Sequence, residues 1–156
     1  MSFTINTKIN GKPISASAEA STSLLEFLRD TLEMKGSKLC CNTGECGACT
    51  IIYNGMPINS CVTMAADANG AEIVTIEGLA KGDVLHPVQE AFLQEGAMQC
   101  GYCVPGMVLT TVALLKRNSS PTREQIVEAL NGNLCRCGSH NRIVRAVMRA
   151  AKEMAP

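Results

Sequence analysis

The sequence lacks tryptophan altogether and holds few other aromatic residues. Only two tyrosines and three phenylalanines occur among 156 residues, so the core must be built mainly from aliphatic side chains and methionine. The chain also lacks an excess of either charge, with 14 basic and 14 acidic side chains. This balance excludes the electrostatic footprint of a nucleic-acid-binding protein and gives no attraction to anionic lipid. No stretch approaches the roughly 20 apolar residues that a membrane-spanning helix needs.

The N-terminal segment Met1–Asn6 has no basic region, no apolar run and no twin arginine, so it does not resemble an export signal. We therefore expect a cytoplasmic protein without direct membrane insertion, although a folded subunit can be exported with a partner that carries a signal. Cytosolic thiols stay reduced, and the nine cysteines therefore indicate metal ligands before disulfides.

Eight of the nine cysteines fall into two groups with the spacing of iron–sulfur ligands. The first group has the plant-type [2Fe–2S] spacing C-x4-C-x2-C followed by a distant fourth cysteine, and consists of Cys41, Cys46, Cys49 and Cys61. The second group has the spacing C-x2-C-x31-C-x-C and consists of Cys100, Cys103, Cys135 and Cys137. Two clusters on one small chain predict electron transfer, with the chemistry that makes or uses the electrons on another polypeptide.

Zinc is the alternative metal for both cysteine groups. Tetrahedral zinc sites favour closely spaced cysteine pairs, which only Cys46 and Cys49 supply cleanly in the first group. In the second group a redox-active C-x2-C motif would need a βαβ context, whereas helical patterns surround it. The ninth cysteine, Cys40, competes with Cys41 but lacks the x4 spacing to Cys46. We interpret Cys40 as a spare thiol packed beside the cluster.

The first half of the chain has the pattern of strands around one helix. Residues 3–9 and 13–18 are expected to form strands joined by a turn at Asn10–Gly11. Leucines at helical spacing from Leu24 to Leu32 predict a helix with N-cap candidates at 21–23 and an end at Gly36, followed by a metal-binding loop over 37–49. Further strands are expected at 50–53 and 73–76, with a turn at 54–55. This order is typical of a small β-grasp-like domain.

The composition changes near residues 78–83, and the pattern beyond them is helical. Helices are expected to begin near Pro87, Pro105, Pro121 and Ser139, with short connections that favour a four-helix bundle. Pro105 suits a first helical turn and Ser139 a capping position, so both ligand pairs would lie by positive helix ends that favour an anionic cluster. We therefore predict an α+β fold with a ferredoxin-like domain over 1–78 and a helical [2Fe–2S]-binding domain over 83–156.

Four segments together form a specific combination: Gly-Ser-Lys at 36–38, CNTGECGACT at 41–50, QCGYCVPGM at 99–107 and GNLCRC at 132–137. With them the chain resembles, over nearly its whole length, the small iron–sulfur subunit of the molybdenum hydroxylases, the xanthine dehydrogenase and aldehyde oxidoreductase family. The resemblance implies a plant-ferredoxin-like β-grasp domain followed by a four-helix bundle. It also implies a large partner subunit that holds molybdenum on a molybdopterin cofactor.

The resemblance further implies the order of electron flow. Electrons from oxidation of an aldehyde or an N-heteroaromatic substrate would pass from molybdenum to the second group and then to the first. Gln99 and Cys137 match positions that approach the pterin. The final acceptor would be a flavin subunit with FAD, or a cytochrome with haem, or another acceptor, and this chain would hold no substrate and no catalytic residue.

Two departures from the family pattern bear on the acceptor and on one loop. Cys40 stands where the family usually has glycine, and its thiol is expected to shift that loop or its potential. Gly138–Ser139–His140 replaces the common Thr-Gly-Tyr run. The Cys-Arg-Cys-Gly run at 135–138, followed by Arg142–Ile143, resembles subunits of the isoquinoline and nicotinate type, some of which pass electrons to cytochromes, whereas residues 104–107 resemble the flavin-linked branch. His140 could replace a thiolate, but Cys fills all eight positions, so we expect a packing or hydrogen-bonding role for it.

Two functions of other classes compete with this interpretation. A free-standing two-cluster ferredoxin would shuttle electrons between transient partners, and a zinc-bound adaptor would be colourless. Soluble shuttles tend to carry a strong charge bias that steers their partners. The zero net charge and the uncharged residues 96–99 favour a stable, apolar interface instead.

Overall fold

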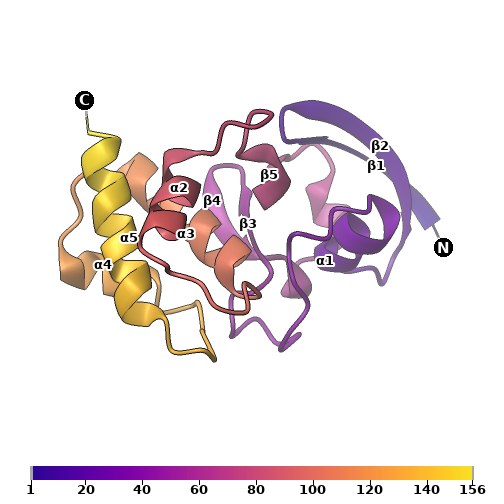
Figure 1. Cartoon of the computed structure of the whole chain (residues 1–156). Coiled ribbons are helices and arrows are strands. Elements are labelled where there is room, and N and C mark those ends of the chain that lie inside the picture. The colour runs from indigo at the N-terminus through magenta and orange to yellow at the C-terminus, as the bar shows by residue number, and fades with distance from the viewer. Residues whose placement is uncertain (1, 156) are drawn as a thin grey trace.

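The structure is a computed structural model that describes residues 2–155, and it combines a five-stranded sheet with a set of helices (Figure 1). The strands are β1 (Ser2–Ile9), β2 (Lys12–Glu19), β3 (Thr50–Tyr53), β4 (Met56–Asn59) and β5 (Glu72–Val74). Their order across the sheet is β2-β1-β5-β3-β4. Strands β1 and β5 are parallel, and all other neighbours are antiparallel. The predicted α+β class is therefore confirmed.

Two tight Asn-Gly turns fix the hairpins of this sheet. Asn10 and Gly11 have φ of 51° and 78°, and Asn54 and Gly55 have φ of 47° and 83°. Positive φ at both central residues is the condition for the turn that matches the twist of a hairpin. The sequence predicts both turns but misses β4, because this four-residue strand contains Pro57 and does not alternate. Strand β4 lies at the edge of the sheet, where proline is tolerated.

The helix expected to begin after a cap at 21–23 and to end at Gly36 starts as predicted but is shorter than predicted. Helix α1 covers only Leu24–Glu26 and continues as a π-helix over Phe27–Thr31. Its start is fixed by a capping box, in which Glu26 N donates to Ser23 Oγ at 3.2 Å and Ser23 N donates to Glu26 Oε2 at 2.8 Å. Beyond it Glu33 adopts a φ of 55°, which a continuing helix does not allow.

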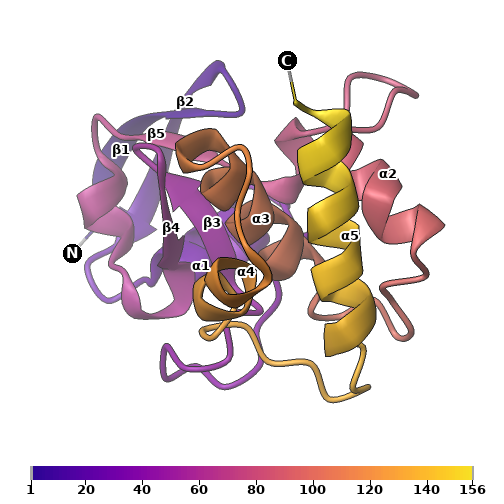
Figure 2. The ribbon, with the colours of Figure 1, turned by 90° about the vertical axis from the view of Figure 1, so that its left-hand side faces the viewer.

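The second half of the chain forms the four helices that the sequence predicts. They are α2 (Pro87–Gln94), α3 (Val104–Arg117), α4 (Arg123–Ala129) and α5 (His140–Glu153). Helix α3 packs against β3 and β4 and also contacts α2 and α4, while α5 packs on α2 and α4 (Figure 2). Short 3-10 helices over Ser60–Val62, Ala65–Ala68 and Ile76–Gly78 lie in the connections before and after β5.

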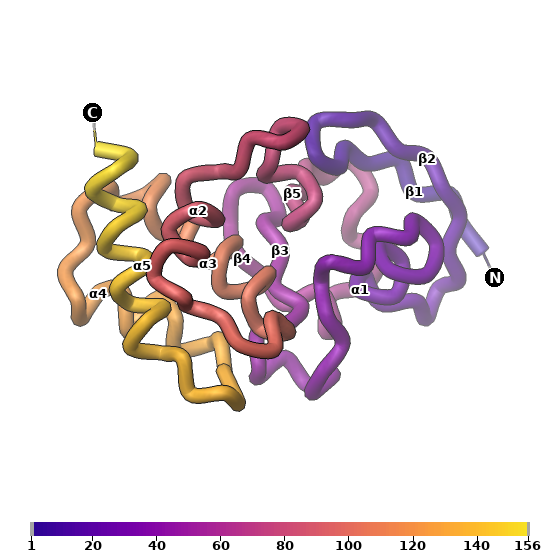
Figure 3. The backbone as a smooth tube through the Cα atoms, in the orientation of Figure 1, coloured from indigo at the N-terminus to yellow at the C-terminus, as the bar shows by residue number. Residues whose placement is uncertain are grey.

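Strand β3 lies between two hydrophobic cores. Ile51 is buried with Phe27 and the sheet, whereas Ile52 is buried with Phe92 and the helices. Successive side chains of a strand point to opposite faces, so neighbouring residues serve different cores. Strands β1 and β2 lie at one end of the molecule and α4 and α5 at the other (Figure 3). Within residues 2–155 no helix combines the length and apolar character that membrane crossing requires.

Candidate metal centres

The first cysteine group lies in the loop before β3 and in the 3-10 helix after β4. Cys46, Cys49 and Cys61 are buried, and Cys41 is half-buried at the outer side of the loop. The loop can curl because Gly44 and Gly47 have φ of 81° and 68°. The four predicted ligands of this group therefore approach one another from two separate stretches of chain.

Backbone donors surround the outer thiol of this group. The N–H groups of Thr43 and Cys46 both point at Cys41 Sγ, at 3.4 Å each. Hydrogen bonds from Thr43, its side chain first, and from Cys46 lower the pKa of Cys41 to about 5. A thiol held as a thiolate is the form that binds iron, and N–H donors to sulfur tune a cluster's potential.

The second cysteine group lies in two loops between helices. Cys100 and Cys103 precede α3, and Cys103 occupies its N-cap with Pro105 in the first turn, as predicted. Cys135 and Cys137 lie in the loop before α5. The loops before β3 and before α5 emerge on the same side of the molecule (Figure 3).

The predicted cap of α5 is wrong in its detail. Ser139 occupies the N-cap position, but its side chain caps no N–H group. Gln99 reaches this point from the loop before α3, and its Nε2 donates to Cys137 O at 3.1 Å and to Ser139 Oγ at 3.4 Å. The two residues that the resemblance places near the pterin, Gln99 and Cys137, are thus in direct contact.

The eight thiols are arranged in four pairs. Cys137 Sγ lies 3.4 Å from Cys100 Sγ. Burial and then the neighbouring Cys135 raise the pKa of Cys103 to about 12, while burial and then Cys49 raise the pKa of Cys61 to about 11. Cys46 is paired with Cys41, and burial is the main cause that raises the pKa of Cys46.

This pairing bears on the kind of metal centre that the thiols fit. A single tetrahedral zinc needs four ligands around one ion. Among residues 2–155 no three Cys, His, Asp or Glu side chains are arranged to hold one metal ion. A [2Fe–2S] cluster instead takes four thiolates shared between two irons, and two pairs in each group fit that requirement.

The remaining candidate residues have other roles. Cys40 is exposed rather than packed beside the first group, so that part of its interpretation is wrong. His86 is the N-cap of α2, with its Nδ1 accepting from Val88 N at 3.2 Å, and its role as a helix-start residue is confirmed. His140 is the first residue of α5 and is exposed rather than packed.

Sequence reasoning missed Asn133, which joins the two ligand loops. Its side chain is buried, and Nδ2 donates to Gly47 O in the first loop at 3.1 Å. Its Oδ1 accepts from Thr110 Oγ1 of α3 at 2.9 Å. The only signal was its place two residues before Cys135, inside a segment that resembles the family.

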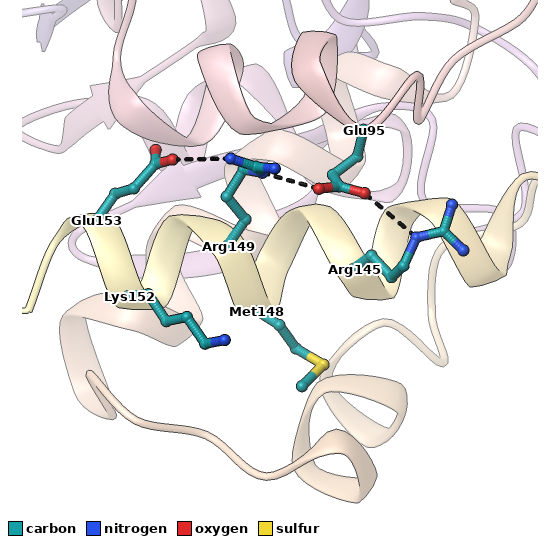
Figure 4. Close-up of a pocket in the computed structure, with 6 residues that line it drawn as sticks. All are labelled: Glu95, Arg145, Met148, Arg149, Lys152 and Glu153. Atoms are coloured by element: carbon teal, nitrogen blue, oxygen red, sulfur yellow. Dashed lines mark hydrogen bonds and ion pairs between the residues drawn. The ribbon is translucent and has the colours of Figure 1, made fainter.

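A shallow hollow on α5 is lined by none of the cysteines (Figure 4). Glu95, just after α2, bridges Arg145 Nε at 3.2 Å and Arg149 Nε at 2.8 Å. Arg149 also pairs with Glu153 at 3.4 Å. These ion pairs fasten the end of α2 to α5, and their role is structural.

Two protein-family models match the chain. A 2Fe-2S iron-sulfur cluster binding domain matches residues 7–75, and a [2Fe-2S] binding domain matches residues 75–148. The fold and the two cysteine groups therefore define a protein with two [2Fe–2S] domains. In solved structures the chain is similar to quinoline 2-oxidoreductase from Pseudomonas putida 86, with a TM-score of 0.94 and 38% identity over 97% of this chain and 94% of that chain.

Curated relatives identify the family more closely. The chain is 50% identical to one subunit of the nicotinate dehydrogenase of Pseudomonas putida, over 97% of both chains. It is 44% identical to the nicotinate dehydrogenase small FeS subunit of Eubacterium barkeri over 98% of both chains. It is 41% identical to the aldehyde oxidoreductase iron-sulfur-binding subunit PaoA of Escherichia coli strain K12, over 94% of this chain and 71% of that one. The chain belongs to the small iron–sulfur subunits of the molybdenum hydroxylases.

Proposed function

We propose that this chain conducts electrons out of a molybdenum-dependent dehydrogenase and holds one [2Fe–2S] cluster in each cysteine group. The arrangement of the eight thiols in four pairs carries this proposal, because each iron of such a cluster takes two thiolates. The ligands would be Cys41, Cys46, Cys49 and Cys61 for the first cluster, and Cys100, Cys103, Cys135 and Cys137 for the second. When bound, each cluster supplies a site that accepts and releases one electron at a time.

The chain's own residues hold these sites in different surroundings. In the first group three thiols are buried and the Thr43 and Cys46 N–H groups face Cys41 Sγ, which favours a negatively charged centre. In the second group Cys103 and Cys137 lie close to the N-termini of α3 and α5, where the helix dipole also favours negative charge.

The second group is the proposed point of entry from the molybdopterin subunit. Gln99 is exposed, and its side-chain amide is anchored on Cys137 O. It thus presents a polar group to a partner directly beside a proposed ligand, which supports the pterin-facing roles of Gln99 and Cys137. Electrons would leave through the first group to a cytochrome, a flavin subunit or another acceptor.

We propose an N-heteroaromatic acid or a related ring as the substrate of the complex rather than an aldehyde. The relatives named nicotinate dehydrogenase are 50% and 44% identical to this chain, against 41% for the aldehyde oxidoreductase relative. The Cys-Arg-Cys-Gly run at 135–138, followed by Arg142–Ile143, supports the same substrate class, because it resembles subunits of the isoquinoline and nicotinate type. The substrate would bind to the large subunit.

We also propose the finer division of the fold. Residues 1–78 would form a plant-ferredoxin-like β-grasp domain, which the mixed sheet and the cysteine loop before β3 support. Residues 83–156 would form a four-helix bundle, which α2 to α5 support. The two family matches meet at residue 75, close to this boundary. The nine cysteines support a cytoplasmic location, where thiols stay reduced.

The proposal is tested by isolating the chain from its native host and measuring molybdenum and iron in the product. We expect about four irons per chain, because two [2Fe–2S] clusters contain that number. Molybdenum and a large subunit should co-elute, and nicotinate should bleach the visible absorbance of the clusters. Four irons without molybdenum or a partner would instead support a free-standing ferredoxin, and a colourless zinc protein would contradict both.

A further inference from the structure

An apolar hollow lies between α2 and the first turn of α3, and its volume is about 200 Å³. Apolar side chains form most of its wall, among them Leu85, Leu93, Met98, Val104 and Pro105. Of the described residues that line it, none is charged, and Gln89 alone has a polar side chain. The Oε1 atom of Gln89 already accepts from His86 N at 3.0 Å in the cap of α2. The hollow therefore fits an apolar group.

Large apolar side chains at this hollow are exposed to solvent. Leu93 is 54% exposed, and Leu85 is 38% exposed. Single exposed apolar residues are common on protein surfaces, whereas a group of them around a hollow is typical of an interaction site. A transient partner is normally steered by charge, which the lining lacks. The hollow therefore has the character of the core of a permanent interface.

A tight return of the chain after α2 connects this hollow to the second cysteine group. Gly96 has a φ of 56°, and its N–H donates to Leu93 O at 3.0 Å. Beyond this turn Met98 packs against the helical core and forms part of the wall of the hollow. The next residue, Gln99, is exposed, and its Nε2 donates to Cys137 O at 3.1 Å. Two consecutive residues thus serve the hollow and the proposed point of electron entry.

We propose that an apolar side chain of the large molybdopterin-binding subunit occupies this hollow, and that Leu93 and Met98 anchor the interface. The inference rests on the proposed function, in which Gln99 faces the pterin. A subunit that reaches Gln99 also covers the hollow beside it, because Met98 and Gln99 are adjacent. A second copy of this chain at the same place would cover Gln99 and block electron entry, and the acceptor is assigned to the first cysteine group.

The test places a charge at the hollow in the native complex. Leu93→Glu should weaken binding of the large subunit by at least about tenfold, because the interface would bury an unpaired carboxylate. Leu93→Met keeps an apolar side chain and should bind as the wild type does. Val127→Glu is the matched control, because Val127 is 46% exposed on α4 and does not line the hollow. Each complex is diluted, and the molybdenum that stays with the iron-containing small subunit is measured.

Iron content and helical circular dichroism are measured first for every variant. A wild-type chain without two clusters would overturn the proposed function itself. Leu93→Glu should keep about four irons, because the side chain is mostly solvated. If it lost iron, Leu85→Glu, which also changes the lining of the hollow, carries the same test.

The remaining outcomes concern the docking site alone. With both clusters present, unchanged binding of the large subunit in the glutamate variant would overturn the inference and leave the proposed function standing. Release of a flavin or cytochrome subunit with the molybdenum subunit retained would assign the hollow to that partner and also overturn it. A dimer of the isolated chain that the same variant dissociates would assign the hollow to a second copy, with the same consequence.

Discussion

Cys40 and Cys41 are adjacent in the chain yet differ in what surrounds their sulfur atoms. Cys41 Sγ accepts two backbone hydrogen bonds, whereas the Cys40 side chain is exposed. The hydroxyl of Tyr102 donates to Leu39 O and ties down the residue before this pair. The surroundings of the two thiols thus agree with the cysteine spacing in favouring Cys41 as the ligand.

We predict that Cys40→Gly leaves about four irons per chain, because Cys40 is not needed as a ligand. Cys41→Ser, the matched substitution one residue later, should reduce iron to about two per chain and remove one set of cluster signals. Iron analysis and paramagnetic resonance of both variants measure this. A loss of half the iron in the Cys40 variant would show that the ligand assignment is wrong.

Cys137 gives a prediction about electron flow rather than assembly alone. Cys137→Ser should abolish electron transfer from molybdenum to the natural acceptor, because this thiol belongs to the cluster at the proposed entry point. Molybdenum chemistry should persist in a single turnover with an artificial acceptor. Stopped-flow reduction with nicotinate measures both, and normal turnover with the natural acceptor would contradict the assigned order.

At the scale of elements, α2 shows how local capping and packing combine. His86 caps its first turn through Nδ1, and Phe92 is fully buried in the helical core, whereas the next residue, Leu93, is 54% exposed. The helix is therefore fixed at its start by one hydrogen bond, and along its length by the burial of one face in the helical core.

The cap of α2 predicts a pH dependence of stability. Burial, and then the positive charge of Lys116, lower the pKa of His86 below its ordinary value of about 6.5. The folded state thus favours neutral His86, so its stabilisation is complete above about pH 6.5 and is lost as the pH falls through the lowered pKa. His86→Asn keeps a capping group that does not titrate there. Thermal melts between pH 7 and 5 should show a smaller loss for this variant.

The buried face of α2 predicts a large difference between neighbouring substitutions. Phe92→Ala should lower the free energy of unfolding by about 3–5 kcal/mol, because it leaves a cavity in the helical core. Leu93→Ala should change it by less than about 0.5 kcal/mol, because that side chain is mostly solvated. Chemical denaturation of both variants measures the difference, and equal effects would contradict the described core.

Much of the element order could be predicted from the sequence because its signals are local. Asn-Gly pairs marked both turns, and prolines marked the starts of α2 and α3. Strand β4 was missed because it is short and contains Pro57, and the first helix was drawn too long because nothing local shows that Glu33 turns left-handed.

The candidate site divides in the same way. Cysteine spacing predicts two ligand groups from local sequence alone, whereas the role of Asn133 depends on a contact with Gly47, 86 residues earlier in the chain. No sequence period or motif encodes such a contact. The sequence also did not predict that the Ser139 side chain caps no N–H group or that Cys40 is exposed. Burial and hydrogen bonding at both residues are set by the tertiary fold.

At the scale of the whole molecule, most of the proposed cluster ligands lie in loops, while the two large cores lie under the sheet and among the helices. We predict that iron removal lowers the thermal midpoint but keeps most of the helical circular dichroism, because ligand binding contributes to folding, while the buried residues of the two large cores described within 2–155 include no cysteine. Limited proteolysis should then cut first within 37–49 and 131–139. Initial cleavage in the β1–β2 hairpin would contradict this distribution of stability.

Strand β3 has a consequence for how the chain acquires its structure. Ile51 and Ile52 face different cores, so a shift of one residue in strand pairing would exchange the side chains that the two halves receive. Neither half can therefore correct such a mistake without disturbing the other. The pairing register of this four-residue strand therefore determines the packing of the sheet half and of the helical half at the same time.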